Sequence, residues 1–133
     1  GEMEGGEPND RFSSYWDDDT EMTYPLILAK IPVKNPWEIF AYLPFGNWND
    51  CPDTPELMAA AKYWFQQHGA IPAAMSHDEL EFELPTPISK ERAMEVAVEQ
   101  YGFCPDLDQN EDGSIGSLAD VLWQSTVWYF WWD

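Results

Sequence analysis

The sequence predicts a single small α+β domain over residues 26–133, with about three helices packed on a sheet of about five strands. Segments with helical periodicity and capping signals alternate with short apolar segments typical of strands. The chain has 133 residues, which is the size of one domain. The expected order is β-β-α-β-β-α-α-β, with a mixed or antiparallel sheet that carries the helices on one face.

Two strands are expected where the domain begins, over residues 26–33 and 38–45. Apolar residues alternate along both, as in half-buried strands: Ile27, Ala29, Ile31 and Val33 in the first, and Ile39, Ala41 and Leu43 in the second. A short helix that begins at Pro36 is the competing interpretation of the second segment. Residues 46–53 have the Gly, Asn, Asp and Pro content of a loop.

A helix with clear boundaries is expected next. Thr54 caps it, Pro55 occupies its first position and Gly69 ends it. Two short strands should follow, over residues 70–75 and 79–84. The second of them alternates strictly, with Leu80, Phe82 and Leu84 facing the core and Glu79, Glu81 and Glu83 facing solvent.

Two more helices and a last strand complete the predicted domain. Ser89 caps the second helix and Gly102 ends it. Its residues divide between an apolar face, with Ala93, Met94, Ala97, Val98 and Tyr101, and a solvated face, with Glu91, Glu95 and Glu99. Residues 103–116 are expected to form a polar loop, 117–124 a short helix, and 126–132 a strand. Aromatic residues on both faces of this strand indicate that it is central or covered on both sides.

The charge of the chain limits the partners it can bind. Its 25 Asp and Glu residues and 6 Lys and Arg residues give a net charge of −19. Nucleic-acid surfaces need clustered Lys and Arg, and anionic membranes attract basic segments, so neither partner is expected. A basic protein is the expected partner, and a monomer or weak dimer is the expected state.

The sequence also indicates a cytoplasmic protein. No basic segment followed by an apolar one opens the chain, so no signal peptide is visible. The longest purely apolar run, residues 127–132, is far shorter than the ~20 residues that span a bilayer. Cys51 and Cys104 are too few for a disulfide scaffold and are expected to be reduced thiols.

Residues 1–25 are expected to form an acidic, largely flexible arm. They contain eight Asp and Glu residues against one Arg, a composition typical of disordered segments. Aromatic and apolar side chains are interleaved with the acids: Phe12, Tyr15, Trp16, Met22 and Tyr24. We expect these side chains to dock partly on the domain; a solvated tail is the alternative.

Residues suited to chemistry gather in the loops. The triplet Cys-Pro-Asp occurs twice, at 51–53 and 104–106, each time beside a helix end. A cysteine nucleophile paired with His77 is disfavoured, because neighbouring carboxylates raise the pKa of a thiol. Cys51, His77 and Cys104 are also suitable zinc ligands, but no Cys-x-x-Cys pair preorganises them.

One of these loops is similar to a calcium-binding loop. Asp108, Asn110 and Asp112 place oxygen side chains at positions 1, 3 and 5, and Gly113 follows where such a loop must turn. At position 12, where a bidentate acid is expected, the residue is Ala119. No cofactor is expected apart from this possible calcium ion, and a polar surface turn is the alternative.

Several spaced motifs resemble a bacterial family known as domain of unknown function 4253. They are Asn-Pro-Trp-Glu at 35–38, Trp-Asn-Asp-Cys-Pro at 48–52, Phe-Cys-Pro-Asp at 103–106, Asp-Gln at 108–109 and Phe-Trp-Trp-Asp at 130–133. The family has a short Asp-Gln-Gly-x-Gly-Thr-Leu connection where this chain inserts residues 110–114, so the calcium-like loop would be peculiar to this member. The resemblance implies a bacterial stand-alone or C-terminal module and no particular reaction.

The resemblance groups these loops into one signature, and we infer that they converge at one edge of the sheet. The candidate binding patch comprises Trp48, Asn49, Cys51, His77, Cys104, Asp106, Asp108, Gln109, Trp132 and Asp133. The alternative is a buried polar-aromatic cluster that holds the C-terminus, with Trp indoles donating to Asp.

The leading hypothesis is a non-enzymatic, acidic binding module for a basic protein partner, with an immunity-like or accessory role in bacterial conflict. DNA mimicry is a variant of the same class. Acidic surfaces speed the capture of basic partners, and Trp and Tyr side chains anchor interfaces. The alternatives are a small metal-dependent hydrolase that uses an Asp/His/Cys patch, and a structural calcium-binding variant of the domain.

Overall fold

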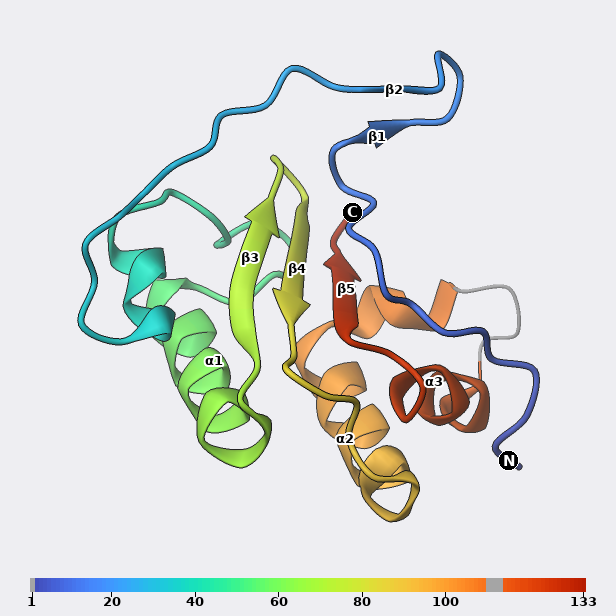
Figure 1. Cartoon of the computed structure of the whole chain (residues 1–133). Helices are drawn as coiled ribbons and strands as arrows, with labels where there is room; N and C mark the ends of the chain where they lie inside the picture. Colours follow the sequence, from blue (N-terminus) through green and yellow to red (C-terminus); the bar gives the residue numbers. More distant parts are fainter. Residues whose placement is uncertain (1, 110–113) are drawn as a thin grey trace.

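The computed structural model describes the backbone of residues 2–109 and 114–133, and the side chains of all of these except 108 and 109. Helices and strands follow one another in an α+β arrangement (Figure 1). They are β1 (Trp16–Asp17), β2 (Met22–Thr23), the 3-10 helix η1 (Pro36–Ala41), α1 (Thr54–His68), β3 (Ile71–Met75), β4 (Glu79–Glu83), α2 (Lys90–Phe103), the 3-10 helix η2 (Pro105–Gln109), α3 (Ile115–Leu122) and β5 (Val127–Trp131). The predicted class, a small α+β domain, is confirmed.

The described strands are divided between two antiparallel sheets, whereas the sequence predicts one sheet. β1 and β2 form a hairpin of their own, and the main sheet has the order β3-β4-β5. Its register places Glu81 of β4 opposite Tyr129 of β5. β5 is therefore an edge strand of this sheet and not a central one. Its neighbouring residues Val127 and Trp128, which point to opposite faces, are both buried, so the alternative prediction of a strand covered on both sides is confirmed.

Neither of the first two predicted strands forms. Residues 26–33 pair with no strand of the described chain, and most of their side chains are exposed. η1 lies where the second strand was predicted to begin, which confirms the competing helix at Pro36. The side chain of Glu38 accepts the Asn35 N–H at 2.9 Å and so caps this helix. Alternating apolar residues indicate a face to bury, but a strand also needs the edge of another strand.

α1 has the predicted extent but a different cap. Asp53, one residue before Thr54, accepts the Glu56 N–H on its Oδ1 at 3.0 Å. Gly69 ends the helix in the left-handed region, at a φ of 73°. With 15 residues α1 is the longest helix of the described chain, and no helix there is long and apolar enough to cross a membrane.

The second and third helices differ from their predicted boundaries by a few residues. α2 continues one residue past Gly102, which a helix tolerates at a modest cost. Within the expected polar loop over 103–116, the short helix η2 follows directly. α3 begins at Ile115, two residues earlier than predicted, because Ser114 caps it by accepting the Ser117 N–H at 3.0 Å.

The buried face of α2 agrees only in part with the predicted one: Ala93 and Ala97 are buried as predicted. Val98 is 55% exposed, whereas Val96 and Gln100 are buried. Glu99, expected on a solvated face, accepts hydrogen bonds from Tyr63 Oη at 2.8 Å and Trp64 Nε1 at 3.1 Å. Adjacent residues are separated by about 100° around a helix, so a stripe displaced by one residue exchanges buried and exposed positions.

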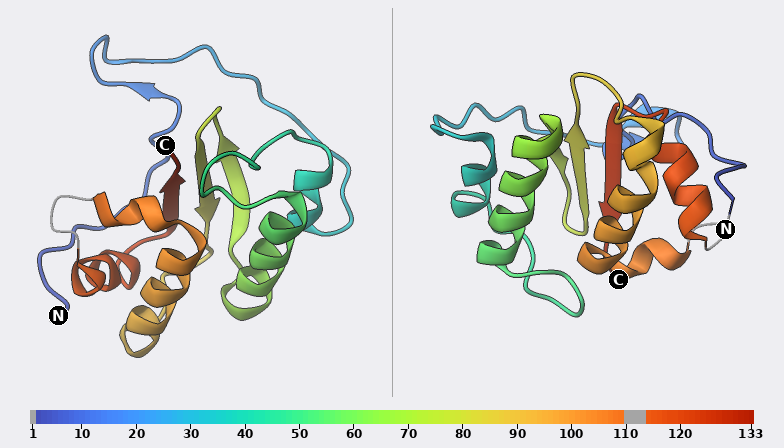
Figure 2. Two further views of the ribbon diagram at one scale, coloured as in Figure 1. Left: turned by 180° about the vertical axis from the view of Figure 1, so that it is seen from behind. Right: turned by 90° about the horizontal axis from the view of Figure 1, so that it is seen from below.

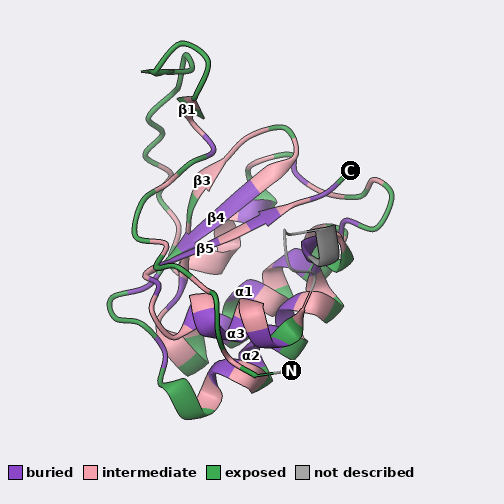
Figure 3. Cartoon of the chain, turned by 90° about the vertical axis from the view of Figure 1, so that its right-hand side faces the viewer, coloured by how far each residue is buried: buried purple, intermediate pink, exposed green. Residues whose placement is uncertain are grey.

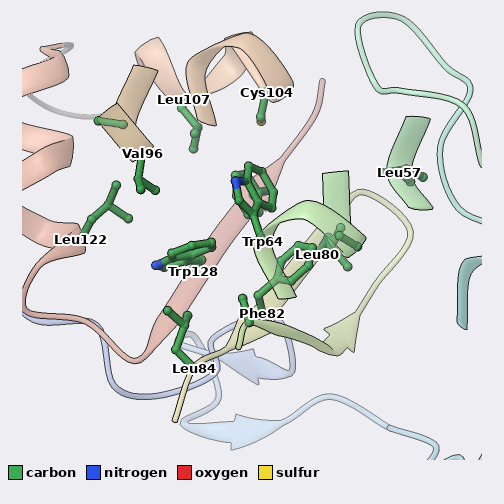
Figure 4. Close-up of a cluster of buried hydrophobic side chains, with 14 of the residues drawn as sticks. Leu57, Trp64, Leu80, Phe82, Leu84, Val96, Cys104, Leu107, Leu122 and Trp128 are labelled. Atoms are coloured by element: carbon green, nitrogen blue, oxygen red, sulfur yellow. The ribbon is translucent and has the colours of Figure 1, made fainter. Parts of the chain in front are cut away.

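The helices lie on one face of the main sheet (Figure 3), as the sequence predicts. Trp64 of α1 occupies the centre of the core between them (Figure 4). Its ring stacks on Phe130 of β5 with centroids 5.5 Å apart. It contacts Phe82, Phe103 and Trp128 edge to face, at 5.6, 5.0 and 5.5 Å. One tryptophan therefore joins α1, α2, β4 and β5.

The N-terminal segment, residues 2–15, is attached to the domain through its backbone. The Gly6 N–H donates to Asp120 Oδ2 at 2.8 Å, and the Asn9 C=O accepts the N–H groups of Thr126 and Val127 at 3.1 and 3.0 Å. The segment runs beside α3 and β5, and the chain then crosses to the other side of the molecule to reach η1 (Figures 1 and 2). These contacts occupy the outer edge of β5.

Glu81 lies on the face of the main sheet that the helices do not cover. It is nevertheless buried, so the prediction that it faces solvent is wrong. Its side chain is 0% exposed. Its carboxyl group accepts the backbone N–H of Ser13 at 3.1 Å and that of Ser14 at 2.8 Å. The alternation along β4 is correct, since Leu80 and Phe82 lie in the core, but the N-terminal segment covers the opposite face. A period of two shows which residues share a face and not what covers it.

Candidate functional site

Three of the sequence motifs meet around the last residues of the chain. Phe45 and Trp48, from the loop before α1, lie 5.7 and 6.4 Å from the Trp132 ring. Phe103, at the end of α2, contacts the same ring at 5.4 Å. The residues gathered here are called the C-terminal cluster: Phe45, Trp48, Asn49, Cys51, Phe103, Cys104, Asp106, Trp132 and Asp133.

Hydrogen bonds from two loops hold the chain end in this cluster. Asn49 Nδ2 donates to the main-chain oxygen of Asp133 at 2.6 Å. The Asp133 N–H in turn donates to Asp106 Oδ2 at 2.9 Å. Both Cys-Pro-Asp loops therefore reach the C-terminus, the first through Asn49 and the second through Asp106.

The loop before α1 takes its shape from residues that tolerate a left-handed backbone. Gly46 has a φ of 90°, and a Cβ atom there would lie 2.3 Å from the Pro52 carbonyl oxygen. Asn47 and Asn49 have φ values of 64° and 44°, which asparagine adopts more readily than most residues. The Asn47 N–H closes the loop by donating to the Pro52 C=O at 3.0 Å. This geometry directs Trp48 and Asn49 toward the chain end.

Both cysteines are free, and both are buried within the C-terminal cluster. Burial raises the pKa of the Cys51 thiol and that of the Cys104 thiol to about 12. The charge of Asp106 raises the pKa of Cys104 further, but burial is the larger cause. The Cys104 thiol donates a hydrogen bond to the Trp131 C=O at 3.1 Å. These thiols are protonated at neutral pH and are not activated nucleophiles.

His77 does not join the cysteines, although its turn borders the C-terminal cluster. The turn contributes the Asp78 C=O, which accepts the Trp132 N–H at 3.1 Å. The His77 side chain itself is 89% exposed, with Nε2 at 3.4 Å from Asp78 Oδ1. No relay of cysteine, histidine and carboxylate is therefore assembled from these predicted residues.

Four of the predicted residues fall outside the description of the structure. Asn110 and Asp112 belong to residues 110–113, and the side chains of Asp108 and Gln109 are likewise not described. The calcium loop and the place of Gln109 in a binding patch thus stay predictions. Within residues 2–109 and 114–133, no group of three or more His, Cys, Asp or Glu residues is arranged to hold a metal ion.

The C-terminal cluster has a buried centre, whereas Asn49 and Asp133 at its rim are exposed. Cys51, Cys104 and Trp132 are 5%, 0% and 1% exposed. This matches the alternative of a buried polar-aromatic cluster, with one difference: Trp132 Nε1 has no hydrogen-bond partner among the described residues. The indole-to-Asp bond is found instead between Trp123 and Asp120, at 2.8 Å.

The comparisons with known proteins concern the domain that contains this cluster. Residues 27–133 match the model of a family described as Domain of unknown function (DUF4253). The chain belongs to this family. The C-terminal cluster lies wholly within the DUF4253 match, and the N-terminal segment precedes it. No curated protein and no solved structure matches the chain.

A second surface lies at the start of the DUF4253 match and before it. Residues 16–28, called the acidic segment, expose Trp16 (43%), Met22 (65%), Tyr24 (50%), Leu26 (56%), Ile27 (92%) and Leu28 (96%). Four acids and no Lys or Arg accompany them. Asp17 is the largest of the influences that raise the pKa of the Tyr24 phenol, as expected in a field of carboxylates. The sequence identified the first three apolar residues but assigned the others to a strand.

Proposed function

We propose that this DUF4253 protein is a non-enzymatic module that binds a basic protein partner, in an immunity-like or accessory role. The observation that carries the proposal is the acidic segment, where four carboxylates at residues 17–21 are followed by five exposed apolar side chains at residues 22–28. Single exposed apolar side chains are ordinary on a protein surface. A continuous run of them bordered by charge is typical of an interaction site.

Charge favours a basic partner for this surface. The chain carries a net charge of −19, and no Lys or Arg occurs between Arg11 and Lys30. Such a field accelerates the approach of a basic protein and disfavours an acidic one. Trp16 and Tyr24 supply the large amphipathic rings that anchor protein interfaces.

The C-terminal cluster supports a non-enzymatic role for the predicted patch. Its thiols are buried and protonated, and His77 lies apart from them. Its tryptophans contact one another and Phe45 in place of an open surface. We therefore assign to the C-terminal cluster the role of stabilising the domain. The acidic segment, which the same domain carries, would contact the basic partner.

The test is binding of a partner captured from a lysate of the source organism, purified and titrated by calorimetry against the full chain. We expect the captured protein to be basic and its affinity to fall as salt rises. The triple variant Asp17→Asn, Asp18→Asn, Asp19→Asn should weaken binding by about tenfold or more. The pair Trp16→Ala and Tyr24→Ala should weaken it comparably by removing the anchors.

A charge-matched variant separates a local contact from a general effect of net charge. Glu83→Gln, Glu91→Gln and Glu95→Gln remove the same three charges at exposed positions outside the acidic segment. We expect this variant to bind almost as the parent does. Equal losses in the two triple variants, or a partner indifferent to both, would contradict the proposal.

A further inference from the structure

One apolar run on the surface has the form of a strand but pairs with no described strand. Residues 24–33 contain no helix, turn or bend, and none of them has a positive φ. They cross the molecule from β2 to η1 without folding back (Figure 1). Leu26, Ile27 and Leu28 are 56%, 92% and 96% exposed. Most of the run lies inside the DUF4253 match, so it is part of the family's domain.

The backbone of this run has an open edge. The Tyr24 N–H donates to the Tyr15 C=O at 2.7 Å, so residue 24 directs its backbone groups toward the chain that leads into β1. Successive residues of an extended chain direct these groups to opposite edges, so Ile27, Ala29 and Ile31 direct theirs the other way. The N–H groups of these three residues have no acceptor within the described chain. Such an edge is a template for another strand.

The charges of the exposed run are divided between its two ends. Four acids at residues 17–21 precede the apolar side chains, and Lys30 and Lys34 follow them. No acid occurs between Glu21 and Glu38. A basic partner is attracted by the first end and repelled by the second. Two copies of the run that lie antiparallel, in contrast, place each charged end beside the opposite charge.

We propose that residues 26–32 of two copies of this chain pair as antiparallel strands and form a dimer. A two-fold axis through Ala29 pairs Ile27 of one copy with Ile31 of the other, and these residues exchange backbone hydrogen bonds. The Ile31 C=O already accepts the Val33 N–H at 2.9 Å, and its second lone pair is available to the other copy. Pairing also covers the apolar side chains that the single chain exposes.

The prolines of the run fit this register. Pro32 lies opposite Leu26 of the other copy, in a pair that exchanges no backbone hydrogen bonds. Its missing N–H therefore costs nothing there. Pro25 comes before Ile27, the first bonded residue, and its missing N–H ends the ladder at that point.

The same register joins opposite charges. Lys34 lies opposite Tyr24 of the other copy, whose phenol is in the field of the acids at residues 17–19. The net charge of −19 on each chain opposes the pairing, but about 0.15 M salt screens charges that are more than about 8 Å apart. A two-stranded ladder is marginal by itself, so we expect a weak, concentration-dependent dimer.

The pairing is independent of the basic partner proposed above, because it needs only the chain itself. Residues 26–28 belong both to the ladder and to the acidic segment. The dimer and the complex with a basic partner would therefore exclude each other. Self-association would regulate access to the acidic segment.

The test is sedimentation velocity of the full chain from about 5 μM to about 1 mM, in about 0.15 M salt. We expect monomers at the lowest concentration and dimers at the highest. Ala29→Pro removes the N–H on the axis and should weaken dimerisation at least about tenfold. Leu28→Pro, whose N–H faces the other edge, is the matched control and should weaken it less than about threefold. Both residues lie in the exposed run, so neither change should alter the fold.

Charge variants separate this proposal from the proposed function. Lys30→Glu with Lys34→Glu should weaken dimerisation at least about tenfold and leave the acidic segment able to bind a basic protein. Arg11→Glu with Lys62→Glu makes the same change of charge at exposed positions outside the run and should have little effect. A monomer that still binds a basic protein contradicts the pairing alone, and a dimer without a basic partner contradicts the proposed function alone.

The register has its own measurement. In a dimer of one ¹³C-labelled and one unlabelled chain, an NOE is expected between the Hα atoms of Leu28 and Lys30, because their pair brings the Cα atoms to about 4.5 Å. Its absence from a dimer would overturn the proposal. So would a chain that stays monomeric at about 1 mM, or equal effects of the two proline variants or of the two charge variants.

Discussion

The C-terminal cluster and the N-terminal segment are attached to the same sheet in different ways. The cluster is held by side chains: Trp132 lies among Phe45, Trp48 and Phe103, and Asn49 and Asp106 bond the chain end. The N-terminal segment is held by its backbone, which bonds to side-chain oxygens of Asp120, Ser125 and Glu81. Some of its side chains are also covered, since Ser14 is buried and Met3 packs against the core.

This difference explains how the two regions divide their roles. An anchor made of side chains depends on the identity of each residue, because a substitution changes volume, hydrogen bonding or both. Docking through the backbone constrains a residue mainly where space is tight, as at Gly6, where a Cβ atom would lie 2.6 Å from the Val121 N. The acidic segment follows directly, so its acids and aromatic rings can serve a partner while residues 6–14 hold the chain on the domain.

The largest expected difference concerns the two buried thiols of the cluster. With the pKa of Cys51 and Cys104 raised to about 12 by burial, the native thiolate population at pH 8 should be about a thousandfold below that of the unfolded chain. Alkylation by iodoacetamide, followed by mass spectrometry, should be negligible in the native protein and complete in guanidinium. Rapid modification of either native thiol would show that the cluster is open and would return a cysteine nucleophile to consideration.

The second expected effect compares two tryptophans, one from each region. Trp132→Ala removes a ring that is 1% exposed and should lower the free energy of unfolding by about 3–5 kcal/mol. Trp16→Ala, at a ring that is 43% exposed, should change it by less than about 0.5 kcal/mol. Urea denaturation measures both. Similar losses in the two variants would mean that the two regions contribute alike to stability.

A third effect tests the backbone attachment itself. Glu81→Gln replaces one acceptor oxygen by an N–H donor facing the N–H groups of Ser13 and Ser14. It should lower the free energy of unfolding by about 1–3 kcal/mol, and hydrogen exchange at both amides should become faster. Glu83→Gln, at an exposed position on the same strand, is the control. If Glu81→Gln behaves as this control does, the segment is held by other contacts.

The smallest expected effect is a dependence of stability on pH. Burial, assisted by Arg92, lowers the pKa of His68 below its ordinary value. The unfolded chain therefore binds a proton first as the pH falls below about 6.5, and the stability contributed by neutral His68 is lost until the folded pKa is passed. Denaturation between pH 7 and 5 in the His77→Gln variant, where His68 is the one histidine left, measures this loss. An increase in stability over the same range would contradict the sign.

Local signals predicted the parts of the fold that local interactions determine. The extent of α1, the start of α2 directly after Ser89 and the strand β4 were predicted because proline placement and strict alternation act within a few residues, although the Ser89 side chain makes no capping hydrogen bond. The predicted strand over residues 26–33 failed because a strand needs a partner edge, and periodicity carries no information about one. The solvated face assigned to Glu81 failed for a related reason: a distant segment covers it.

The candidate site shows the same division. The spaced motifs indicated that Trp48, Asn49, Cys104, Asp106 and Trp132 belong together, and the structure brings them into one cluster. The burial of Cys104 and Trp132 followed from tertiary packing, whereas Asn49 stays exposed. Gln100 gave no sequence signal for its burial in α2, because an amide on a helix is usually a surface residue.

The sequence by itself determined the α+β class, the main helices, the family and the strongly acidic character of the chain. These depend on composition and on patterns within a few residues, which no distant contact can change. Only the tertiary structure decided that β5 is an edge strand and that the N-terminal segment covers Glu81. Each of these depends on which distant segments meet, and that is settled by how the whole chain buries its apolar surface and satisfies its hydrogen bonds.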